Sequence, residues 1–558
     1  MGKGRGKDNS RGNGEGKGGR GGGHHRLHDE PRRRDADHLR LLPAFDALGG
    51  LRPGASAVVS LETGVPQATA YGVASFFHLI ARPDVDVRVC TGLSCQMAGA
   101  DDLLARLRTV GAAVDPCTCL GQCDRAPATL RTDTGGGGHF TPLHAQRDGT
   151  AVTGWLQTEL AAPNLSADDA ELVINLAGED DPTWAAAQRA AALGGDAVVA
   201  EISAAKLRGR GGAGFPAGFK WAAVRRNAAR DPVIICNADE GEPGTFKDRE
   251  VMAQRPHLLL EGMAIAARAV GASELIIYLR AEFAAPREAL LGAIVQARAA
   301  GHLDGLRVEL ALGHGAYICG EETALIEALE GKRGMPRHKP PFPTDSGYLG
   351  RPTLMNNVET FACVPAIILR GGAWFCGLGR GDATGTKLYP ISGDVARPGV
   401  YELPLGVSFA ELLAVAGGVT GGALLAFSPG GASSGLLPGH MADVALDFGP
   451  LQAAGSMLGS AGVVVLNDTR DVLKATLTRA RFFRDESCGQ CAPCRVGTQV
   501  LVRLLERMAH DGGSVADREA LERVSWEMEE GSICGLGQAA PIPVRHLMQH
   551  FLQAPPTS

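Results

Sequence analysis

Short apolar runs alternate with amphipathic segments along the middle of the chain, in the order expected of an α/β protein. The segment Ala197–Lys206 has a helical pattern, and Pro232–Cys236 is a continuous apolar run typical of a buried strand. A helix is then predicted over His257–Val270 and a strand over Leu275–Leu279. This repeated order predicts an α/β domain.

Units with other patterns lie on either side of this domain. Before it, His38–Ala81 is helical, and the strand Val85–Val89 followed by the helix Asp101–Val110 indicates a small β-α-β unit. After it, short strand-like runs surround one helix, Phe409–Ala416, as in a β-grasp module, and Val472–Arg484 opens a helical C-terminal region.

These patterns divide the chain into six parts. Almost nothing apolar occurs in the first 37 residues, which cannot bury a core and are predicted to be disordered. The expected parts are a Gly/Arg-rich tail at 1–37, a truncated helical segment with the β-α-β unit at 38–158, a linker at 159–182, the α/β domain at 183–380, the β-grasp domain at 381–468 and the helical domain at 469–558.

The composition narrows the class of protein. The chain has 558 residues, of which 45% are hydrophobic and 21% charged, as is ordinary for a protein with several packed domains. Residues 1–40 hold eleven Lys and Arg against six Asp and Glu, while the whole chain has a net charge of −6, so the remainder is acidic. This argues against a nucleic-acid-binding body. A solubilising tail is favoured over one that binds RNA or acidic surfaces.

Membrane and secretory signals are missing from the sequence pattern. No run of about 18 uncharged apolar residues occurs, so we expect no membrane insertion. No apolar stretch follows the basic residues of the N-terminus, so we expect no secretory signal. A cytoplasmic protein is therefore expected.

Most of the 13 cysteines are clustered in two places, which indicates metal sites in a reducing compartment. Cys90 and Cys95 follow the first predicted strand, and Cys119 and Cys123 lie beyond the next helix. Four thiolates arranged in this way bind a [2Fe–2S] cluster or a structural zinc ion. The spacing within each pair favours the cluster, because zinc sites with four cysteines usually place two residues within a pair. Cys117 is an alternative ligand to Cys119.

The second group is Cys488, Cys491 and Cys494, each separated from the next by two residues, with Cys534 further along the chain. Three cysteines at this spacing hold three corners of a cubane, and a distant fourth completes it. The group therefore predicts a [4Fe–4S] cluster, with zinc and free thiols as the alternatives.

A glycine-rich stretch, Leu207–Trp221, is a candidate for holding a phosphate group. Glycine lets the backbone approach a ligand closely, successive free N–H groups bind an anion, and a lysine neutralises it. The spacing of Gly209, Gly211 and Gly214 also satisfies the dinucleotide motif, but a helix rather than a strand precedes it, so a Rossmann turn is not indicated. A flexible surface linker is the alternative.

Further candidate ligand residues occur in other loops. Asp239, Glu240 and Glu242 follow a predicted strand, and the carboxyl ends of strands are where α/β proteins place ligand sites. A second glycine loop, Gly313–Thr323, opens a helix, and the Pro- and Lys/Arg-rich run Lys332–Pro343 predicts a rigid extended loop.

Together with Asn356-Asn357 and the box Glu486–Arg495, these motifs resemble the NADH-oxidising flavoprotein subunit of respiratory complex I, a module that also occurs in NAD-linked hydrogenases and formate dehydrogenases. Residues from about 50 to 158, with Glu62–Pro66 and Cys119–Cys123, resemble the thioredoxin-like [2Fe–2S] subunit of the same complexes, fused in front. The resemblance implies FMN, NAD(H), [4Fe–4S] and [2Fe–2S] as cofactors. The implied domains are thioredoxin-like, Rossmann-like, β-grasp (SLBB-like) and C-terminal helical.

The resemblance also implies roles for individual residues. Glu240 and Glu322 would lie near the nicotinamide as catalytic positioning groups. The implied FMN or NAD(H) contacts are Arg208, Gly209, Arg210, Gly211, Gly212, Gly214, Phe215, Lys220, Asn237, Asp239, Glu240, Glu242, Tyr317, Gly320, Glu321, Glu322, Lys339, Phe342, Asn356 and Asn357. The implied ligands are Cys90, Cys95, Cys119 and Cys123 for [2Fe–2S], and Cys488, Cys491, Cys494 and Cys534 for [4Fe–4S].

The fusion and the segments Gly331–Pro343, Pro429–Gly435 and Asp485–Cys491 are most similar to the β (diaphorase) subunit of NAD-dependent formate dehydrogenases that contain molybdenum or tungsten. Such a chain works in a hetero-oligomer, reducing NAD+ with electrons from formate that a molybdopterin-containing partner with further iron–sulfur clusters oxidises. A hydrogenase diaphorase or a complex I subunit is the alternative. A non-enzymatic iron–sulfur relay is the rival from another class, and the retained Lys220 and Glu240 argue against it.

Overall fold

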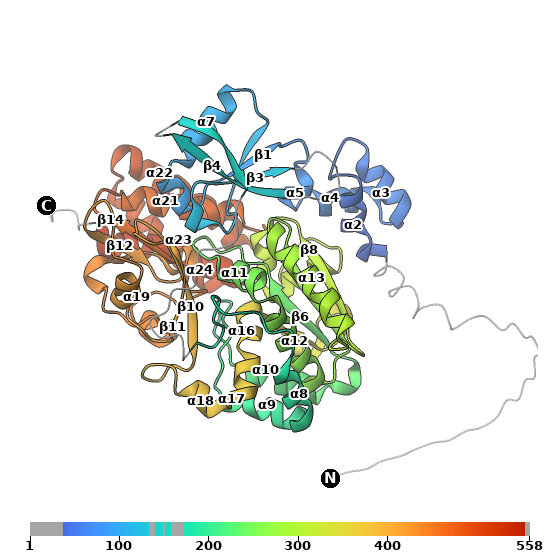
Figure 1. The fold of residues 1–558 in the computed structure, drawn as a ribbon. Coiled ribbons are helices and arrows are strands. Elements are labelled where there is room, and N and C mark those ends of the chain that lie inside the picture. Colours follow the sequence, from blue (N-terminus) through green and yellow to red (C-terminus); the bar gives the residue numbers. More distant parts are fainter. Residues whose placement is uncertain (1–36, 133–139, 149–150, 158–171, 553–558) are drawn as a thin grey trace, which may run out of the picture.

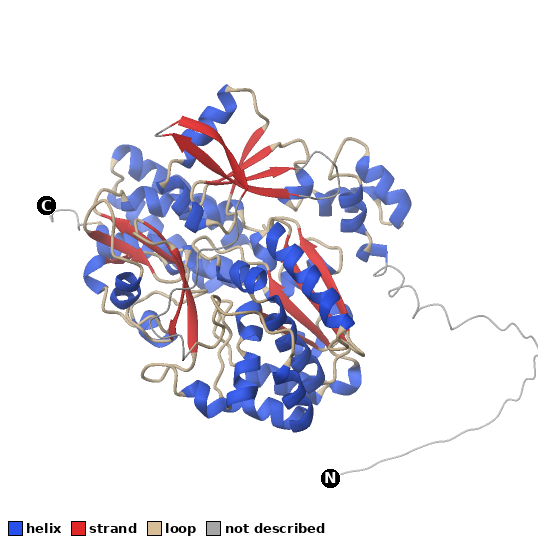
Figure 2. Cartoon of the chain, in the orientation of Figure 1, coloured by secondary structure: helices blue, strands red, loops and turns tan. Residues whose placement is uncertain are grey.

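The computed structural model describes residues 37–132, 140–148, 151–157 and 172–552. The predicted tail lies almost entirely outside these residues. Four groups of elements follow one another along the chain, which we call the N-terminal, central, small β and C-terminal domains, and they pack against one another (Figure 1). The strands form three separate sheets, with helices beside and between them (Figure 2). Within the described residues no helix combines the length and apolarity needed to cross a membrane.

The N-terminal domain begins with helices and continues into a five-stranded sheet of order β2-β1-β3-β4-β5. Strands β1 and β2 are parallel, and the other neighbours are antiparallel. The last two strands lie in a segment for which the sequence predicted no element. The elements are α2 (Leu41–Ala47), α3 (Ala55–Thr63), α4 (Gln67–Ala74), α5 (His78–Ala81), β1 (Val87–Cys90), α6 (Leu93–Met97), α7 (Ala100–Thr109), β2 (Val114–Cys117), η1 (Cys123–Arg125), β3 (Ala128–Thr132), β4 (Phe140–Asp148) and β5 (Ala151–Gln157).

The central domain is built on a four-stranded parallel sheet of order β8-β7-β6-β9. The two predicted strands are confirmed as β6 (Val233–Ala238) and β7 (Glu274–Arg280). Strand β9 lies on the other side of β6, so the strand order reverses there and forms a topological switch point, where α/β proteins bind ligands. The other elements are α8 (Ala185–Leu193), α9 (Gly195–Ala204), α10 (Ala217–Arg226), η3 (Ala228–Arg230), α11 (Lys247–Gln254), α12 (Pro256–Val270), α13 (Ala284–Ala299), β8 (Arg307–Gly313), η4 (Tyr317–Gly320), α14 (Glu322–Leu329), α15 (Pro343–Ser346), η5 (Tyr348–Gly350), β9 (Thr353–Asn357), α16 (Val358–Ala362), α17 (Val364–Arg370) and α18 (Gly372–Cys376).

Local signals set the ends of the helices around this sheet. Helix α12 has Pro256 in its first turn and ends at Gly271, whose φ of 80° is accessible to glycine. The glycine loop ends before α10, so Gly218 and Lys220 are helical and not part of the loop as predicted. Glycine is required at 218 because a Cβ there would lie 2.4 Å from the Oγ of Ser203 in α9.

The small β domain has the sheet order β11-β10-β14-β12-β13, in which only β10 and β14 are parallel neighbours. The one predicted helix is confirmed as α19, but the second helix, α20, was missed. The segment Pro429–Gly435 directly follows strand β12. The elements are β10 (Thr386–Gly393), β11 (Gly399–Pro404), α19 (Phe409–Val415), β12 (Leu424–Ser428), η6 (Ala432–Ser434), β13 (Leu437–Pro438), η7 (Gly439–Met441), α20 (Phe448–Ala453) and β14 (Val463–Asn467).

The C-terminal domain is helical, as predicted. Helix α22 has Pro493 in its first turn and ends at Gly512, and a capping box between Ser514 and Asp517 starts α23. Its elements are α21 (Val472–Asp485), α22 (Ala492–Asp511), α23 (Val515–Gly531), α24 (Gly535–Ala539), α25 (Ile542–His546) and the π-helical turn η8 (Leu547–Phe551).

The described end of the predicted linker is anchored rather than free. The buried carboxylate of Glu402 in β11 accepts the N–H groups of Val173, Ile174 and Asn175 at 2.8, 3.1 and 2.8 Å. The side chains of Val173 and Ile174 belong to the hydrophobic core of the central domain. Residues 172–176 therefore fix the central domain to the small β domain.

Candidate functional site

The switch point of the parallel sheet gathers predicted ligand residues from β6 and β9. Asn237 and Asn357 are register partners at the ends of these two strands. The glycine loop covers this edge, since a Cβ on Gly211 would lie 2.9 Å from the Cβ of Asn357. The indole N–H of Trp221 in α10 donates to Oδ1 of Asn356 at 3.1 Å. Segments far apart in the sequence thus form one site.

Residues of η4 form the facing side of this site. Asn237 donates through Nδ2 to the carbonyl of Gly320 at 2.8 Å. The hydroxyl of Tyr317 donates to the carboxylate of Glu242, whose other oxygen accepts the N–H of Ser433 at 2.7 Å. The small β domain therefore also contributes to the wall.

Charged side chains from three segments meet at this site. Lys220 Nζ lies 2.8 Å from Glu322, and Lys339 Nζ lies 2.8 Å from Glu322 and 3.0 Å from Glu321. Burial alone would raise the pKa of Glu322, but the two lysines outweigh it and lower this pKa to about 2. The ring of Phe215 is 45% exposed with Lys220 Nζ 5.8 Å from its centre, and Phe342 is 52% exposed.

Glu240 makes contacts that the sequence did not predict. Its two carboxylate oxygens accept the N–H groups of Asp248 and Arg249 at 2.9 and 3.1 Å, in the first turn of α11. The side chain is buried, and burial raises its pKa to about 7. Glu240 therefore caps a helix, and both of its oxygens are already used. The neighbouring Asp239 has a buried Oδ2 that no described residue hydrogen-bonds, and burial raises the pKa of Asp239 to about 8.

A buried ion-pair network under the glycine loop was missed by the sequence analysis. Lys247 Nζ lies 2.6 Å from Asp248 and 3.1 Å from Glu359, and Lys387 Nζ lies 2.6 Å from Glu359. Asn357 joins the network by donating to Asp248 at 2.6 Å. These charges come from three elements with no shared motif, so only the fold brings them together.

The glycine loop fits the implied FMN. Arg210 is 1% exposed, and its Nε and Nη1 have no hydrogen-bond partner among the residues that the structure describes. Gly212 and Gly214 have φ values of 144° and 62°, which expose backbone without side chains. Unused buried donors beside bare backbone are what an anionic phosphate requires.

The first cysteine group is buried between the N-terminal and central domains. The thiols of Cys95, Cys90, Cys119 and Cys123 are hydrogen-bonded in series in that order. Backbone N–H groups donate to three of these sulfurs, including one from Gly244 of the central domain to Cys123 at 3.3 Å. Cys95 lies on the short helix α6 rather than on a loop as predicted.

Cys117 stands apart from this series. It is the register partner of Cys90 on the parallel strand β2 and has an electrostatic but no hydrogen-bonding interaction with that thiol. Four sulfurs that contact one another, three of which accept backbone N–H groups, match the donor set of a [2Fe–2S] centre.

The second cysteine group lies where three helices begin or end. Cys491 and Cys534 directly precede α22 and α24, Cys494 lies in the first turn of α22, and Cys488 follows α21. Burial raises the pKa of Cys494 to about 12, and the other three thiols act on it electrostatically, so all four are neighbours. Within the described ranges no three His, Cys, Asp or Glu side chains converge closely enough to hold a single metal ion. The donor set fits a [4Fe–4S] cluster, whose cysteines bind different iron atoms.

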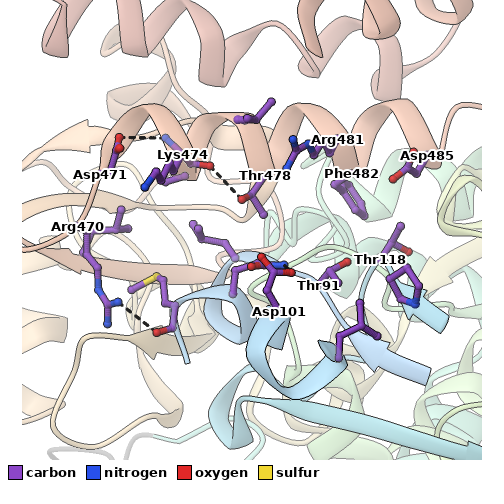
Figure 3. A pocket seen from close by; sticks show the side chains of 18 of the residues that line it. Thr91, Asp101, Thr118, Arg470, Asp471, Lys474, Thr478, Arg481, Phe482 and Asp485 are labelled. Carbon is purple, nitrogen blue, oxygen red and sulfur yellow. Dashed lines mark hydrogen bonds between the residues drawn. The ribbon is translucent and has the colours of Figure 1, made fainter. Parts of the chain in front are cut away.

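A cavity of about 580 Å³ lies between the N-terminal domain and α21 (Figure 3). Thr91 and Thr118 lie on one side of it, and Lys474 and Phe482 on the other. Beside it, the buried Glu486 accepts the hydroxyl of Thr118 and, at 2.9 Å, the N–H of Tyr317. The carboxylate of Glu486, next to the second cysteine group, therefore connects the C-terminal domain to the N-terminal and central domains.

Comparison with known proteins bears on these sites. Family models match residues 27–135 as a thioredoxin-like [2Fe-2S] ferredoxin, 202–366 as the Nuo51 FMN-binding domain, 389–436 as an SLBB domain and 474–554 as the NADH-ubiquinone oxidoreductase-F iron-sulfur binding region. An F-type polypeptide of the NADH-quinone oxidoreductase of Rhizobium meliloti (strain 1021) is 45% identical over 366 residues, which are 64% of this chain and 87% of the relative. The chain belongs to the family of NADH-quinone oxidoreductase F subunits.

Another member of this family, that of Rhodobacter capsulatus, is 45% identical over 371 residues, 64% of this chain and 86% of the relative. A crystal structure of NAD+-reducing [NiFe]-hydrogenase in the H2-reduced state has a chain with a TM-score of 0.82 and 35% identity, covering 93% of this chain and 92% of that chain. This F-type chain therefore has an FMN/NADH-binding domain, a [4Fe–4S] region and a [2Fe–2S] domain, which confirms the predicted cofactors and domain types.

Proposed function

We propose that this chain is the diaphorase subunit of an NAD-dependent formate dehydrogenase, where it reduces NAD+ with electrons that a molybdopterin-containing partner takes from formate. The observation that carries the diaphorase assignment is the switch-point site, where the glycine loop, the ends of β6 and β9 and η4 come together. The formate assignment rests on the similarity of Gly331–Pro343 and Pro429–Gly435 to formate dehydrogenase β subunits.

The residues of the site have distinct tasks in this proposal. FMN, when bound, supplies the exchange between two-electron hydride chemistry and single electrons. Gly211 and Gly214 let the loop backbone approach the cofactor, and Arg210 offers unused donors to its phosphate. Glu322 stays ionised between Lys220 and Lys339, so it orients polar groups of NAD(H) without taking a proton at neutral pH.

Glu240 acts indirectly in this proposal. Because its oxygens cap α11, it fixes the loop that carries Asp239 and Glu242 rather than contacting the nicotinamide. The other predicted FMN and NAD(H) contacts keep their assigned roles.

The cluster ligands follow from the thiol contacts. We assign Cys90, Cys95, Cys119 and Cys123 to [2Fe–2S], because these four are hydrogen-bonded in series and Cys117 is not. The [4Fe–4S] ligands are Cys488, Cys491, Cys494 and Cys534.

A specific observation favours a second candidate, the diaphorase subunit of an NAD-linked hydrogenase. The NAD+-reducing hydrogenase chain matches 93% of this chain, whereas the complex I relatives match 64%. The match to the hydrogenase chain includes the N-terminal domain of this chain. In this alternative the electron donor is H2, and the site described above works in the same way.

The deciding experiment uses the natively purified complex without oxygen. Formate and NAD+ are added to one sample and H2 and NAD+ to another, and NADH is followed by its absorbance. Formation of NADH with formate alone supports the proposal. Formation with H2 alone overturns the formate assignment and supports the hydrogenase assignment. If no NADH forms in either sample and NADH added to a third sample does not bleach the flavin, the diaphorase assignment itself is wrong.

A further inference from the structure

One arginine joins the flavin-site loop to the first cysteine group. Arg280 is 5% exposed and lies at the end of β7. Its Nη1 donates to the main-chain carbonyl of Glu240 at 2.6 Å, and its Nη2 donates to the main-chain carbonyl of Cys119 at 2.7 Å. The N-terminal domain lies beside the central sheet at this boundary (Figure 1). A single guanidinium therefore fixes the loop of Glu240 and the loop of Cys119 relative to each other.

Other contacts show that this boundary is closely fitted. Arg249 of α11 donates to the carbonyl of Gly121 at 2.8 Å and to the carboxylate of Asp124 at 2.9 Å. Gly121 has a φ of 62°, and a Cβ there would lie 2.9 Å from the ring of Phe283 and 3.6 Å from Nη1 of Arg280. Only glycine lets the loop lie this close to the Phe283 ring in this backbone conformation.

The charge of Arg280 lies next to a cysteine of the group. Nη2 also donates to Glu282 at 2.7 Å, and Oε2 of Glu282 is buried with no hydrogen-bond partner in the described part of the chain. Arg280, Glu282 and Cys119 line the same cavity of about 380 Å³. Electron uptake adds one negative charge to an iron–sulfur centre, and a nearby positive charge stabilises that form.

We propose that Arg280 is a positioning residue of the central domain that holds the Cys119 loop against the flavin-site loop and raises the reduction potential of the [2Fe–2S] centre. The proposal rests on the ligand assignment made above. We take an effective dielectric constant of about 20 and a unit charge about 10 Å from the [2Fe–2S] centre. At a fixed solution potential, that charge changes the ratio of reduced to oxidised centre by more than about tenfold.

The test is an EPR-monitored redox titration of both clusters in the whole complex. R280M removes the charge and the bridge, so the [2Fe–2S] potential should fall by the equivalent of about tenfold or more in that ratio, while the [4Fe–4S] potential stays unchanged. R280K keeps the charge and should retain a potential close to that of the wild type. E282Q removes the opposing charge and should shift the potential upward, which also tests the proposal if R280M does not fold.

R470M is the matched control. Arg470 also pairs with a carboxylate, that of Asp394, and donates to a main-chain carbonyl of the N-terminal domain, that of Met97 at 3.2 Å, without contacting a cluster cysteine. It should shift the [2Fe–2S] potential much less than R280M does, because the Arg470 side chain is 33% exposed and solvent screens its charge. An unshifted [2Fe–2S] potential in R280M, or an unshifted one in E282Q, overturns the role of Arg280. Equal shifts of the [2Fe–2S] potential in R280M and R470M overturn this role as well. They would show that weaker packing of the N-terminal domain, and not the charge of Arg280, changes the potential. A wild-type complex without any [2Fe–2S] signal overturns both the ligand assignment and this proposal, whereas NADH formation with formate tests the proposed function separately.

Discussion

Substitution of Gly214 by alanine should weaken FMN binding sharply. Gly214 has a φ of 62°, and a Cβ there would lie 2.3 Å from Cε1 of Phe448. Phe448 cannot move freely, because the guanidinium of Arg208 lies 4.0 Å from its ring centre while Nε of Arg208 donates to the carbonyl of Gly214 at 2.8 Å. The substitution thus strains the backbone of the loop and pushes the small β domain away from the central domain at this contact.

The expected size follows from these two effects. A left-handed conformation costs a residue with a Cβ about 1–2 kcal/mol, and an added methyl group in a packed contact costs about 1–3 kcal/mol. At about 1.4 kcal/mol per factor of ten, a sum of at least about 2 kcal/mol raises the Kd for FMN by at least about 30-fold. Without FMN, the altered loop relaxes to a less strained conformation. FMN binding must then restore the strained conformation, and this cost weakens the affinity.

The assay is titration of the deflavinated protein with FMN, followed by quenching of flavin fluorescence. G209A is the matched control, because a Cβ at Gly209 meets its nearest atom at an ordinary 3.4 Å and φ is not positive. F448A in the G214A background should restore part of the affinity, since it removes the steric contact but not the backbone strain. A Kd for G214A equal to that of G209A would refute the reasoning, and failure of F448A to help would refute its steric part.

Three further changes test other parts of the structure. C534S should abolish the [4Fe–4S] EPR signal and leave flavin content unchanged, whereas C376S, at a cysteine outside both groups, should keep the signal. Burial lowers the pKa of His546 to about 4. Between pH 6.5 and about 4 the unfolded chain therefore binds a proton at this histidine and the folded chain does not. The free energy of unfolding should fall by up to about 3 kcal/mol as the pH drops through this range. Hydrogen exchange of α25 across this pH range should show that loss, and H546Q should flatten it. E402L leaves the three N–H groups of residues 173–175 unsatisfied, which costs about 3 kcal/mol or more, and limited proteolysis should then cut near residue 175 faster than in the wild type.

Local patterns in the sequence predicted many of the elements and the type of each site, although β4, β5 and α20 were missed. The apolar run before Cys236 predicted β6 because a strand buried on both faces must be apolar throughout. The spacing of Cys488, Cys491 and Cys494 predicted a cluster because two intervening residues let one short segment bring its thiols together. The glycine loop could be recognised for the same reason, since its conformational freedom is a property of the residues themselves.

The tertiary structure decided which of these segments meet and what each side chain does there. Strand β9 is inserted beside β6, so Asn357 reaches Asn237, and no pattern in either strand specifies that pairing. Glu240 looked like a pocket residue, yet the position of α11 makes it a helix cap, because buried N–H groups require an acceptor. The bridge made by Arg280 depends on the packing of two domains, and an isolated arginine in a sequence carries no sign of its distant partners.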